Sequence, residues 1–308
     1  MKPDLRVNLG PLTLQNPVMT ASGTFGYAQE FEDLVAFERL GAVVTKTVTL
    51  EPRQGNPPPR IAETPCGMLN SIGLANVGVE TFVREKLPFL SGLETAVVVN
   101  VAGRTQEEFV RIVERLEPEV GFDAFELNFS CPNVREGGLA FSSNPDVTLR
   151  VTQAVRRLTR RCLIVKLTPN VTDIATVAQA AEDGGADAVS AINTVVGMAV
   201  DVYTRKPKLA TVTGGLSGPA IRPVGVARVW QIAQRVSVPV IGIGGIASAE
   251  DALEYLIAGA TAVQIGTATF VDPTTAQRTV DGLQAYCAET GVDRITELIG
   301  SLVLPENP

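Results

Sequence analysis

One cysteine of this chain stands where a side chain could carry acid–base chemistry. Cys131 follows the end of an apolar run and lies between a serine and a proline in "ELNFSCPNV", residues 126–134. The chain has no histidine, so proton transfer must use Cys, Lys, Asp, Glu or Tyr. A thiol with an unperturbed pKa of about 8.5 can act as a base near neutral pH. A free cysteine is also often a small buried hydrophobic residue, so its position alone leaves both interpretations open.

Polar side chains end five apolar runs of the chain. These residues are Lys46, Asn100, Asn128, Lys166 and Asn193. If the runs are parallel strands of one barrel, their carboxyl ends meet on one face, and the five side chains converge there. A single such residue could equally bond to loop backbone, but five together favour a ligand site.

Two further runs end in glycine, in "GIGGI" at residues 242–246 and "IGT" at residues 265–267. Glycines at such positions let backbone N–H groups approach an anion, and phosphate sites are frequently built after the last two strands of a barrel. A plain turn would use the same residues. So would the phosphate site of an aldolase or isomerase.

Eight β-rich apolar runs alternate with helical patterns along the chain. We predict strands within residues 17–22, 42–46, 95–100, 123–128, 163–167, 187–193, 239–245 and 261–266. Helical spacing of apolar residues occurs at 32–40, 107–117, 146–158, 173–186, 224–236 and 249–260. This alternation predicts an α/β fold, a (β/α)8 TIM barrel, in a single domain of residues 1–308. Long loop insertions, residues 49–77 and 194–221, are expected after strands 2 and 6 on the C-terminal face.

Composition narrows the class of protein. The 308 residues are 45% hydrophobic and carry a formal net charge of -7, which opposes a broad nucleic-acid surface. We find no signal-peptide pattern and no run near the roughly 18 apolar residues that span a bilayer, so we expect a cytoplasmic protein. The four cysteines are far apart and form no C-x-x-C pair, so we expect no metal site.

The motifs resemble those of the dihydroorotate dehydrogenase family along essentially the whole chain. The resemblance is carried by "NPVMTASGTFGY" (16–27), "TKTVTLEPRQGNPPPRIAETPCGMLNSIGLANVGV" (45–79), "NFSCPNV" (128–134), "INTVVG" (192–197), "GGLSGPAIRPV" (214–224), "GIGGI" and "IGTA". It implies a single FMN-binding barrel that oxidises dihydroorotate to orotate in pyrimidine biosynthesis. The cysteine in "SCPNV" implies class 1. Two of the motifs are most similar to the class 1B branch, in which a partner subunit with an iron–sulfur cluster and FAD passes electrons to NAD. The fumarate-using class 1A branch is the near alternative.

The resemblance also implies a role for individual residues. Cys131 is expected to be the general base, on a lid of about residues 129–138, and Lys166 a fixed cation beside the flavin. The expected substrate-binding residues are Lys46, Asn70, Ser71, Ile72, Gly73, Leu74, Asn128, Asn133, Asn193 and Thr194. The expected FMN-binding residues are Ala21, Ser22, Lys46, Thr47, Asn100, Asn128, Lys166, Ile192, Gly218, Gly244, Gly245, Gly266 and Thr267. The expected assembly is a homodimer, within a heterotetramer with the iron–sulfur/FAD subunit.

Other functions remain open to the sequence. A tRNA dihydrouridine synthase would need a basic RNA-binding surface, which the acidic balance opposes. The FMN domain of dihydropyrimidine dehydrogenase has a similar cysteine loop, but it works with electron-transfer domains that this chain lacks. A flavin-free phosphate-binding barrel and a non-enzymatic binding module complete the alternatives.

Overall fold

Eight parallel strands form a closed barrel in the computed structural model, which describes residues 2–129 and 144–305. They are β3 (Val18–Thr20), β4 (Ala42–Val44), β7 (Ala96–Val101), β8 (Ala124–Asn128), β9 (Cys162–Leu167), β10 (Ala188–Ala191), β15 (Val240–Ile243) and β16 (Ala262–Ile265). Every residue of β9, β15 and β16 is buried, as expected for parallel strands covered on both faces. The (β/α)8 barrel and all eight predicted strands are confirmed.

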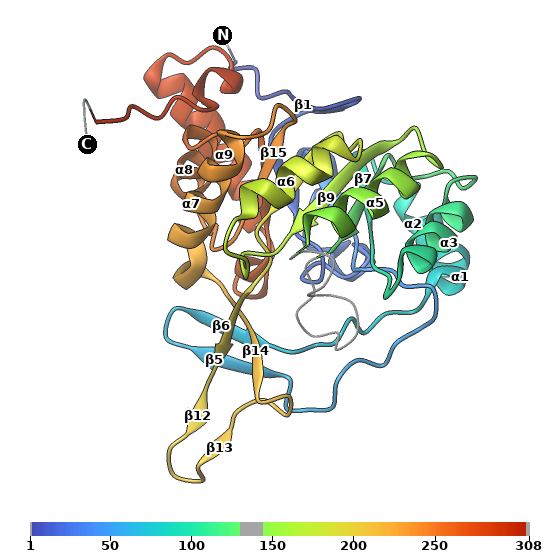
Figure 1. Cartoon of the computed structure of the whole chain (residues 1–308). Coiled ribbons are helices and arrows are strands. Elements are labelled where there is room, and N and C mark those ends of the chain that lie inside the picture. Colours follow the sequence, from blue (N-terminus) through green and yellow to red (C-terminus); the bar gives the residue numbers. More distant parts are fainter. Residues whose placement is uncertain (1, 130–143, 306–308) are drawn as a thin grey trace.

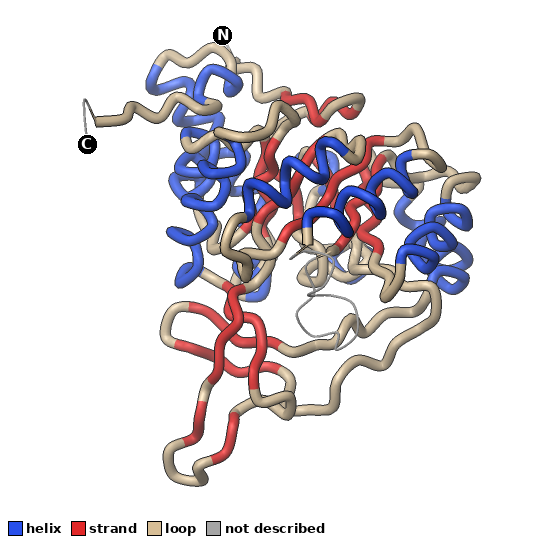
Figure 2. Tube along the Cα trace, viewed as in Figure 1, coloured by secondary structure: helices blue, strands red, loops and turns tan. Residues whose placement is uncertain are grey.

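Helices cover the outside of the barrel (Figures 1 and 2). They are α3 (Gln106–Leu116), α5 (Pro145–Arg156), α6 (Ile174–Asp183), α7 (Arg222–Ala233), α8 (Ala249–Ile257) and α9 (Thr275–Thr290). Their starts follow from the sequence: Thr105 caps α3 through the N–H of Glu108, and Ser248 and Asp251 form a capping box at α8. Five of the predicted helices are confirmed; α9 was not predicted.

The predicted helix at residues 32–40 is wrong. The only helical element of this segment is the 3-10 turn η2 (Phe37–Arg39), and another 3-10 turn, η1 (Gln29–Phe31), ends just before the segment. Aromatic packing explains the difference, because the ring of Phe25 stacks on Phe31 at 4.2 Å and meets Phe37 edge-on at 6.1 Å. These contacts hold the two turns against the core, and they outweigh the weak helical preference of a nine-residue segment.

Short elements lie at one end of the barrel and in the connections between its strands. The hairpin β1 (Val7–Leu9) and β2 (Leu12–Leu14) lies at its amino-terminal end, where the thiol of Cys162, the first residue of β9, donates to Leu9 O at 3.2 Å. Between β4 and β7 run α1 (Val79–Thr81), the π-helical turn η3 (Phe82–Lys86) and α2 (Leu87–Leu90). Further 3-10 turns are η4 (Pro219–Ile221), η5 (Thr267–Phe270) and η6 (Ile295–Leu298).

A second sheet stands at the opposite end of the barrel from the hairpin (Figure 1). The segments after β4 and β10, expected to be loops, contain the strands β5 (Ile61–Thr64), β6 (Gly67–Asn70), β11 (Val195–Met198) and β14 (Thr213–Ser217). They form one antiparallel sheet in the order β11-β14-β6-β5. The small hairpin β12 (Val200–Asp201) and β13 (Lys206–Pro207) extends from it. Two segments far apart in sequence therefore pair with each other above the carboxyl ends of the barrel strands.

Candidate active site

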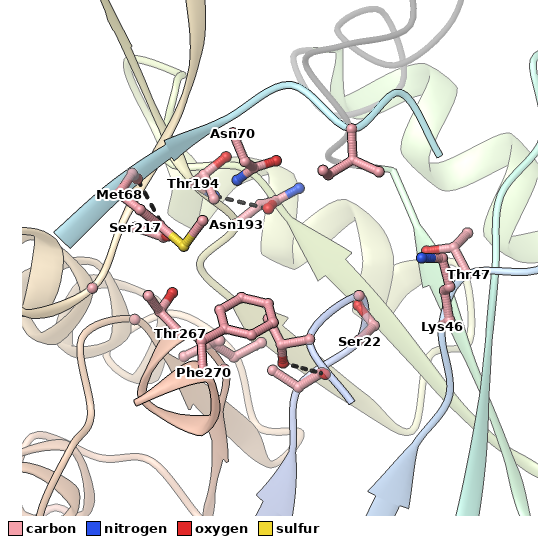
Figure 3. Close-up of a pocket in the computed structure, with 18 of the residues that line it drawn as sticks. Ser22, Lys46, Thr47, Met68, Asn70, Asn193, Thr194, Ser217, Thr267 and Phe270 are labelled. Atoms are coloured by element: carbon pink, nitrogen blue, oxygen red, sulfur yellow. Dashed lines mark hydrogen bonds between the residues drawn. The ribbon is translucent and has the colours of Figure 1, made fainter. Parts of the chain in front are cut away.

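A cavity of about 380 Å³ lies between the barrel and the second sheet. Its walls come from the carboxyl ends of the barrel strands, from β6 and β14, and from the loops that follow β15 and β16. Figure 3 shows Asn70, Asn193 and Thr194 together on one side, Lys46 and Thr47 on another, and Thr267 and Phe270 on a third. Residues from across the whole chain thus meet around one space.

Most residues predicted for the site line this cavity. From the FMN set these are Ala21, Ser22, Lys46, Thr47, Asn128, Lys166, Ile192, Gly218, Gly244, Gly245, Gly266 and Thr267, and from the substrate set Asn70, Ile72, Gly73, Leu74, Asn193 and Thr194. Asn100 and Ser71 do not line it, and both are fully buried. Cys131, Asn133 and the predicted lid from residue 130 onward lie outside the described residues.

Lys166 brings a buried positive charge to the cavity. It is the penultimate residue of β9 with only 4% of its surface exposed, and its Nζ donates to the Ser22 hydroxyl at 3.2 Å. Within residues 2–129 and 144–305 no carboxylate forms an ion pair with it. A buried cation without an anionic partner is costly. Its position at the cavity therefore favours an anionic or electron-accepting ligand as the missing partner.

Lys46 brings a second cation, in a half-buried position. Burial lowers the pKa of its ammonium group, and the neighbouring guanidinium of Arg60 lowers it further, while Glu30 acts in the opposite direction. Arg60 also lines the cavity and was not predicted. The pair makes this wall attractive to a carboxylate.

Asparagine side chains gather at another part of the cavity wall. The Nδ2 of Asn70 reaches Gly215 O at 3.4 Å, and the Oδ1 of Asn193 accepts from the N–H of Thr194 at 2.8 Å. Asn170, which was not predicted, donates to Thr194 O and accepts from the N–H of Val196, each at 3.0 Å. Asn170 could have been identified from the sequence, because it lies in "LTPNVTD", just after the strand end that carries Lys166.

A buried carboxylate on β8 is bonded to side chains of β7, β10 and β16. Glu126, fully buried, accepts from Asn100 at 2.6 Å and from Ser190 and Gln264 at 2.8 Å each. The Oδ1 of Asn100 in turn accepts from the Thr47 hydroxyl at 2.6 Å. Asn100 therefore supports Thr47 from below, and Thr47 lines the cavity in its place. Glu126 was missed because it lies within an apolar strand.

Backbone forms the third side of the cavity. Gly218, Gly244 and Gly245 have φ values of +91°, +129° and +73°. A Cβ on Gly245 would lie 2.8 Å from the Cβ of Arg222 and 2.9 Å from Gly218 O, so only glycine fits. These glycines line the cavity without side chains, so an anion such as a phosphate can approach their backbone N–H groups.

Three comparisons with known proteins agree with the family resemblance of the motifs. The model of the family described as "Dihydroorotate dehydrogenase" matches residues 4–286. The chain is 55% identical over 302 residues to the "Dihydroorotate dehydrogenase B (NAD(+)), catalytic subunit" of Pelobacter propionicus, covering 98% of this chain and 99% of that protein. It is also 55% identical over 304 residues, with the same coverage, to the protein of that name from Trichlorobacter lovleyi.

A solved structure agrees at the level of the fold. The dihydroorotate dehydrogenase of Eimeria tenella, solved in complex with ferulenol, superposes with a TM-score of 0.82 at 24% identity, covering 97% of this chain and 88% of that one. Among the described residues, no helix is both long and apolar enough to cross a membrane. The resemblance inferred from the motifs is confirmed by the family model and by relatives that match nearly end to end, and the chain belongs to the dihydroorotate dehydrogenase family.

Proposed function

We propose that this chain oxidises dihydroorotate to orotate, with FMN as its cofactor, in the synthesis of pyrimidines. The observation that carries the proposal is the buried Lys166 ammonium, which has no carboxylate partner among the described residues and lines the same cavity as an asparagine cluster and a glycine-lined loop. The names of the relatives at 55% identity support the same reaction.

The cavity fits FMN by its chemistry. The glycine-lined loop would hold the phosphate, because Gly244, Gly245 and Gly266 line the cavity without side chains that would cover their backbone. Lys166 and Ser22 would lie against the ring system, where a fixed positive charge favours acceptance of electrons. When bound, FMN supplies the acceptor for the hydride that leaves the substrate.

The chain's own residues would bind the substrate and take its proton. The amides of Asn70, Asn128 and Asn193 can donate and accept together, which suits a ring with N–H and C=O groups. Lys46 would hold the carboxylate. Cys131, three residues after Asn128 at the end of β8, is the general base in this proposal, since the chain has no histidine.

We further propose the class 1B assembly. The relatives are named as catalytic subunits of an NAD-linked enzyme, which supports a partner subunit for this chain as well. In that assembly the single FMN-binding barrel of residues 1–308 forms a homodimer. The iron–sulfur cluster and FAD belong to the partner in a heterotetramer, and the enzyme acts in the cytoplasm.

The visible spectrum and the choice of acceptor test these proposals. The purified chain should be yellow with FMN, and dihydroorotate should bleach it. A colourless protein that does not bind FMN would instead indicate a flavin-free barrel, such as an aldolase or isomerase. Turnover should then be measured with NAD and with fumarate, each with and without an iron–sulfur/FAD subunit. NAD reduction only with the subunit supports class 1B, and fumarate reduction by the chain alone supports class 1A.

A further inference from the structure

A buried tyrosine lies directly beneath the glycine-lined loop. Tyr255 belongs to α8, which begins a few residues after the loop, and it is fully buried. Its hydroxyl donates to Gly244 O at 2.7 Å and lies 3.3 Å from Ile243 O. Burial raises the pKa of this phenol well above its usual range, so the group stays a neutral donor. The carbonyl of Gly244 therefore has a fixed partner below the loop.

Two glycines leave room for this one ring. A Cβ on Gly242, in β15, would lie 2.3 Å from the Cδ1 of Tyr255. A Cβ on Gly225, in α7, would lie 1.9 Å from the hydroxyl oxygen itself. Gly225 thus makes space for the hydroxyl more than for the ring. β15 and α7 each carry a glycine where any side chain would collide with Tyr255, and the hydroxyl can therefore reach the loop.

The hydrogen bond has a consequence on the other side of the peptide. In a trans peptide the C=O of Gly244 and the N–H of Gly245 point in opposite directions. Since Tyr255 holds the carbonyl toward α8, the N–H of Gly245 is directed away from α8, and Gly245 lines the cavity. No acceptor in the described part of the chain takes this N–H. It is available to a ligand anion.

We propose that Tyr255 is a positioning residue for the phosphate-binding end of the site, acting through the orientation of the Gly244–Gly245 peptide. The inference rests on the proposed function, because it takes the phosphate of FMN as the anion. It makes one specific claim beyond that function. The hydroxyl of Tyr255 contributes to binding of the phosphate and not to binding of the flavin ring.

Riboflavin offers the matching ligand, since it carries the ring and lacks the phosphate. The full-length protein is freed of flavin, and the dissociation constants of FMN and riboflavin are measured by flavin fluorescence for wild type and Tyr255→Phe. We expect FMN to bind about tenfold more weakly to the variant, the order of one hydrogen bond to a charged group. Riboflavin affinity should stay within about twofold. Tyr286→Phe, the same change on α9, should alter neither value.

A second variant distinguishes loss of the hydrogen bond from a general loss of folding. Gly225→Ala should push the hydroxyl off Gly244 O and weaken FMN binding in the wild-type background. In the Tyr255→Phe background the same change should have little further effect on binding, because the hydroxyl is already absent. Equal effects of Gly225→Ala in the two backgrounds would overturn the proposal.

The remaining outcomes separate this inference from the proposed function. Unchanged FMN affinity in Tyr255→Phe overturns the inference, as does an equal loss for FMN and riboflavin. Stabilisation of the unliganded protein against heat by inorganic phosphate gives an independent arm. A wild type that binds no flavin, but is stabilised by phosphate in a way that Tyr255→Phe reduces, would remove the proposed function and keep the inference. A wild type that responds to neither ligand removes both.

Discussion

The two ends of the cavity are built in opposite ways. On the β4, β8 and β9 side, the cavity is lined by long or polar side chains such as Lys46, Asn128 and Lys166. After β15 and β16 the wall is glycine backbone, at Gly244, Gly245 and Gly266. Side chains can supply a charge or accept a proton, while bare backbone offers uncharged N–H donors, C=O acceptors and space. The difference suggests a division of labour, with chemistry at the side-chain end and cofactor retention at the glycine end.

The support beneath each end differs in the same sense. Under the side-chain end, the Glu126 carboxylate fixes Asn100, which in turn accepts from Thr47. Under the glycine end, the Tyr255 hydroxyl donates to Gly244 O, and the Asp251 carboxylate accepts from the N–H groups of Ala247 and Ser248. A carboxylate can only accept hydrogen bonds, so it dictates the direction of every bond above it. The side-chain end is therefore held by bonds between side chains, and the glycine end by bonds from side chains to the loop backbone.

Cys131→Ala should give the largest effect and break the side-chain end alone. We expect the rate of flavin reduction by dihydroorotate to fall about a thousandfold near neutral pH, the scale of a lost general base. FMN should stay bound, because the glycine end is untouched. Stopped-flow absorbance of the flavin measures the rate. Unchanged kinetics would remove Cys131 from the mechanism.

The serine variant provides the matched control for that prediction. An alcohol is a far weaker base than a thiol, so Cys131→Ser should retain slow reduction that accelerates as the pH rises. A rate that stays flat into the alkaline range would contradict the role of a base at this position.

Gly245→Ala should break the glycine end alone. The new Cβ would meet Arg222 and Gly218 O below 3 Å at a φ of +73°, so we expect FMN to bind about a hundredfold more weakly. Gly291→Ala is the control, since Gly291 has nearly the same φ, +72°, and no neighbour within 4 Å of the added Cβ. It shares the conformational strain and should leave FMN binding unchanged. Similar losses of FMN affinity in both variants would mean that backbone strain, and not the collision within the loop, weakens binding.

The sequence predicted much of this site because strand ends are recognisable. Lys46, Asn128 and Lys166 interrupt apolar runs, and a parallel barrel brings such interruptions together whatever the loops do. Asn100 shows the limit of that logic. It ends its run in the same way, yet its side chain turns inward to Glu126 and Thr47. Which way a strand-end side chain points depends on partners that only the fold brings near.

Pairing between distant segments was the part that could not be predicted. β6 and β14 are separated by more than a hundred residues, and short glycine-containing runs such as "GMLN" and "TGGLS" have no clear strand pattern. Their ladder forms because the barrel places the two connections on one face. The proposed role of Tyr255 was missed for a similar reason. A tyrosine within an apolar helix is expected to be a core residue, and only the fold shows that its hydroxyl donates to Gly244 O.

Lys166→Met tests whether the buried charge belongs to the chemistry. The variant keeps a long side chain and loses the ammonium, so flavin reduction should slow about tenfold. The flavin-free protein should become more stable, by about 1 kcal/mol, because a buried cation with no anionic partner in the described structure is removed. Stopped-flow rates and thermal unfolding of the flavin-free protein measure the two effects. Loss of both rate and stability would mean that Lys166 is held mainly for structure.

Lys46 should give the smallest effect and sharpen the comparison by pH. Burial and Arg60 lower its pKa below the usual 10.5 in the unliganded protein, so it loses its charge at a lower pH than a free lysine. An anionic ligand such as orotate needs the charged form, and its affinity should therefore fall a few-fold as the pH rises through this lowered pKa. The stability of the unliganded protein should change in the opposite direction. Between the lowered pKa and 10.5 the unfolded chain binds more protons, so stability rises with pH in that window.

The opposite pH dependences of orotate affinity and of protein stability distinguish a ligand-binding lysine from a structural one. Orotate affinity can be followed through the spectrum of the bound flavin, and stability through thermal unfolding, over the same alkaline range. Lys46→Arg is the control, because a guanidinium keeps its charge throughout and should remove both slopes. Lys46 is expected to contact the flavin as well, but FMN affinity should fall less than orotate affinity, since the proposal has the phosphate held by backbone at the other end of the cavity. If FMN and orotate weakened equally with rising pH, the two ends would not act separately and the division of labour would fail.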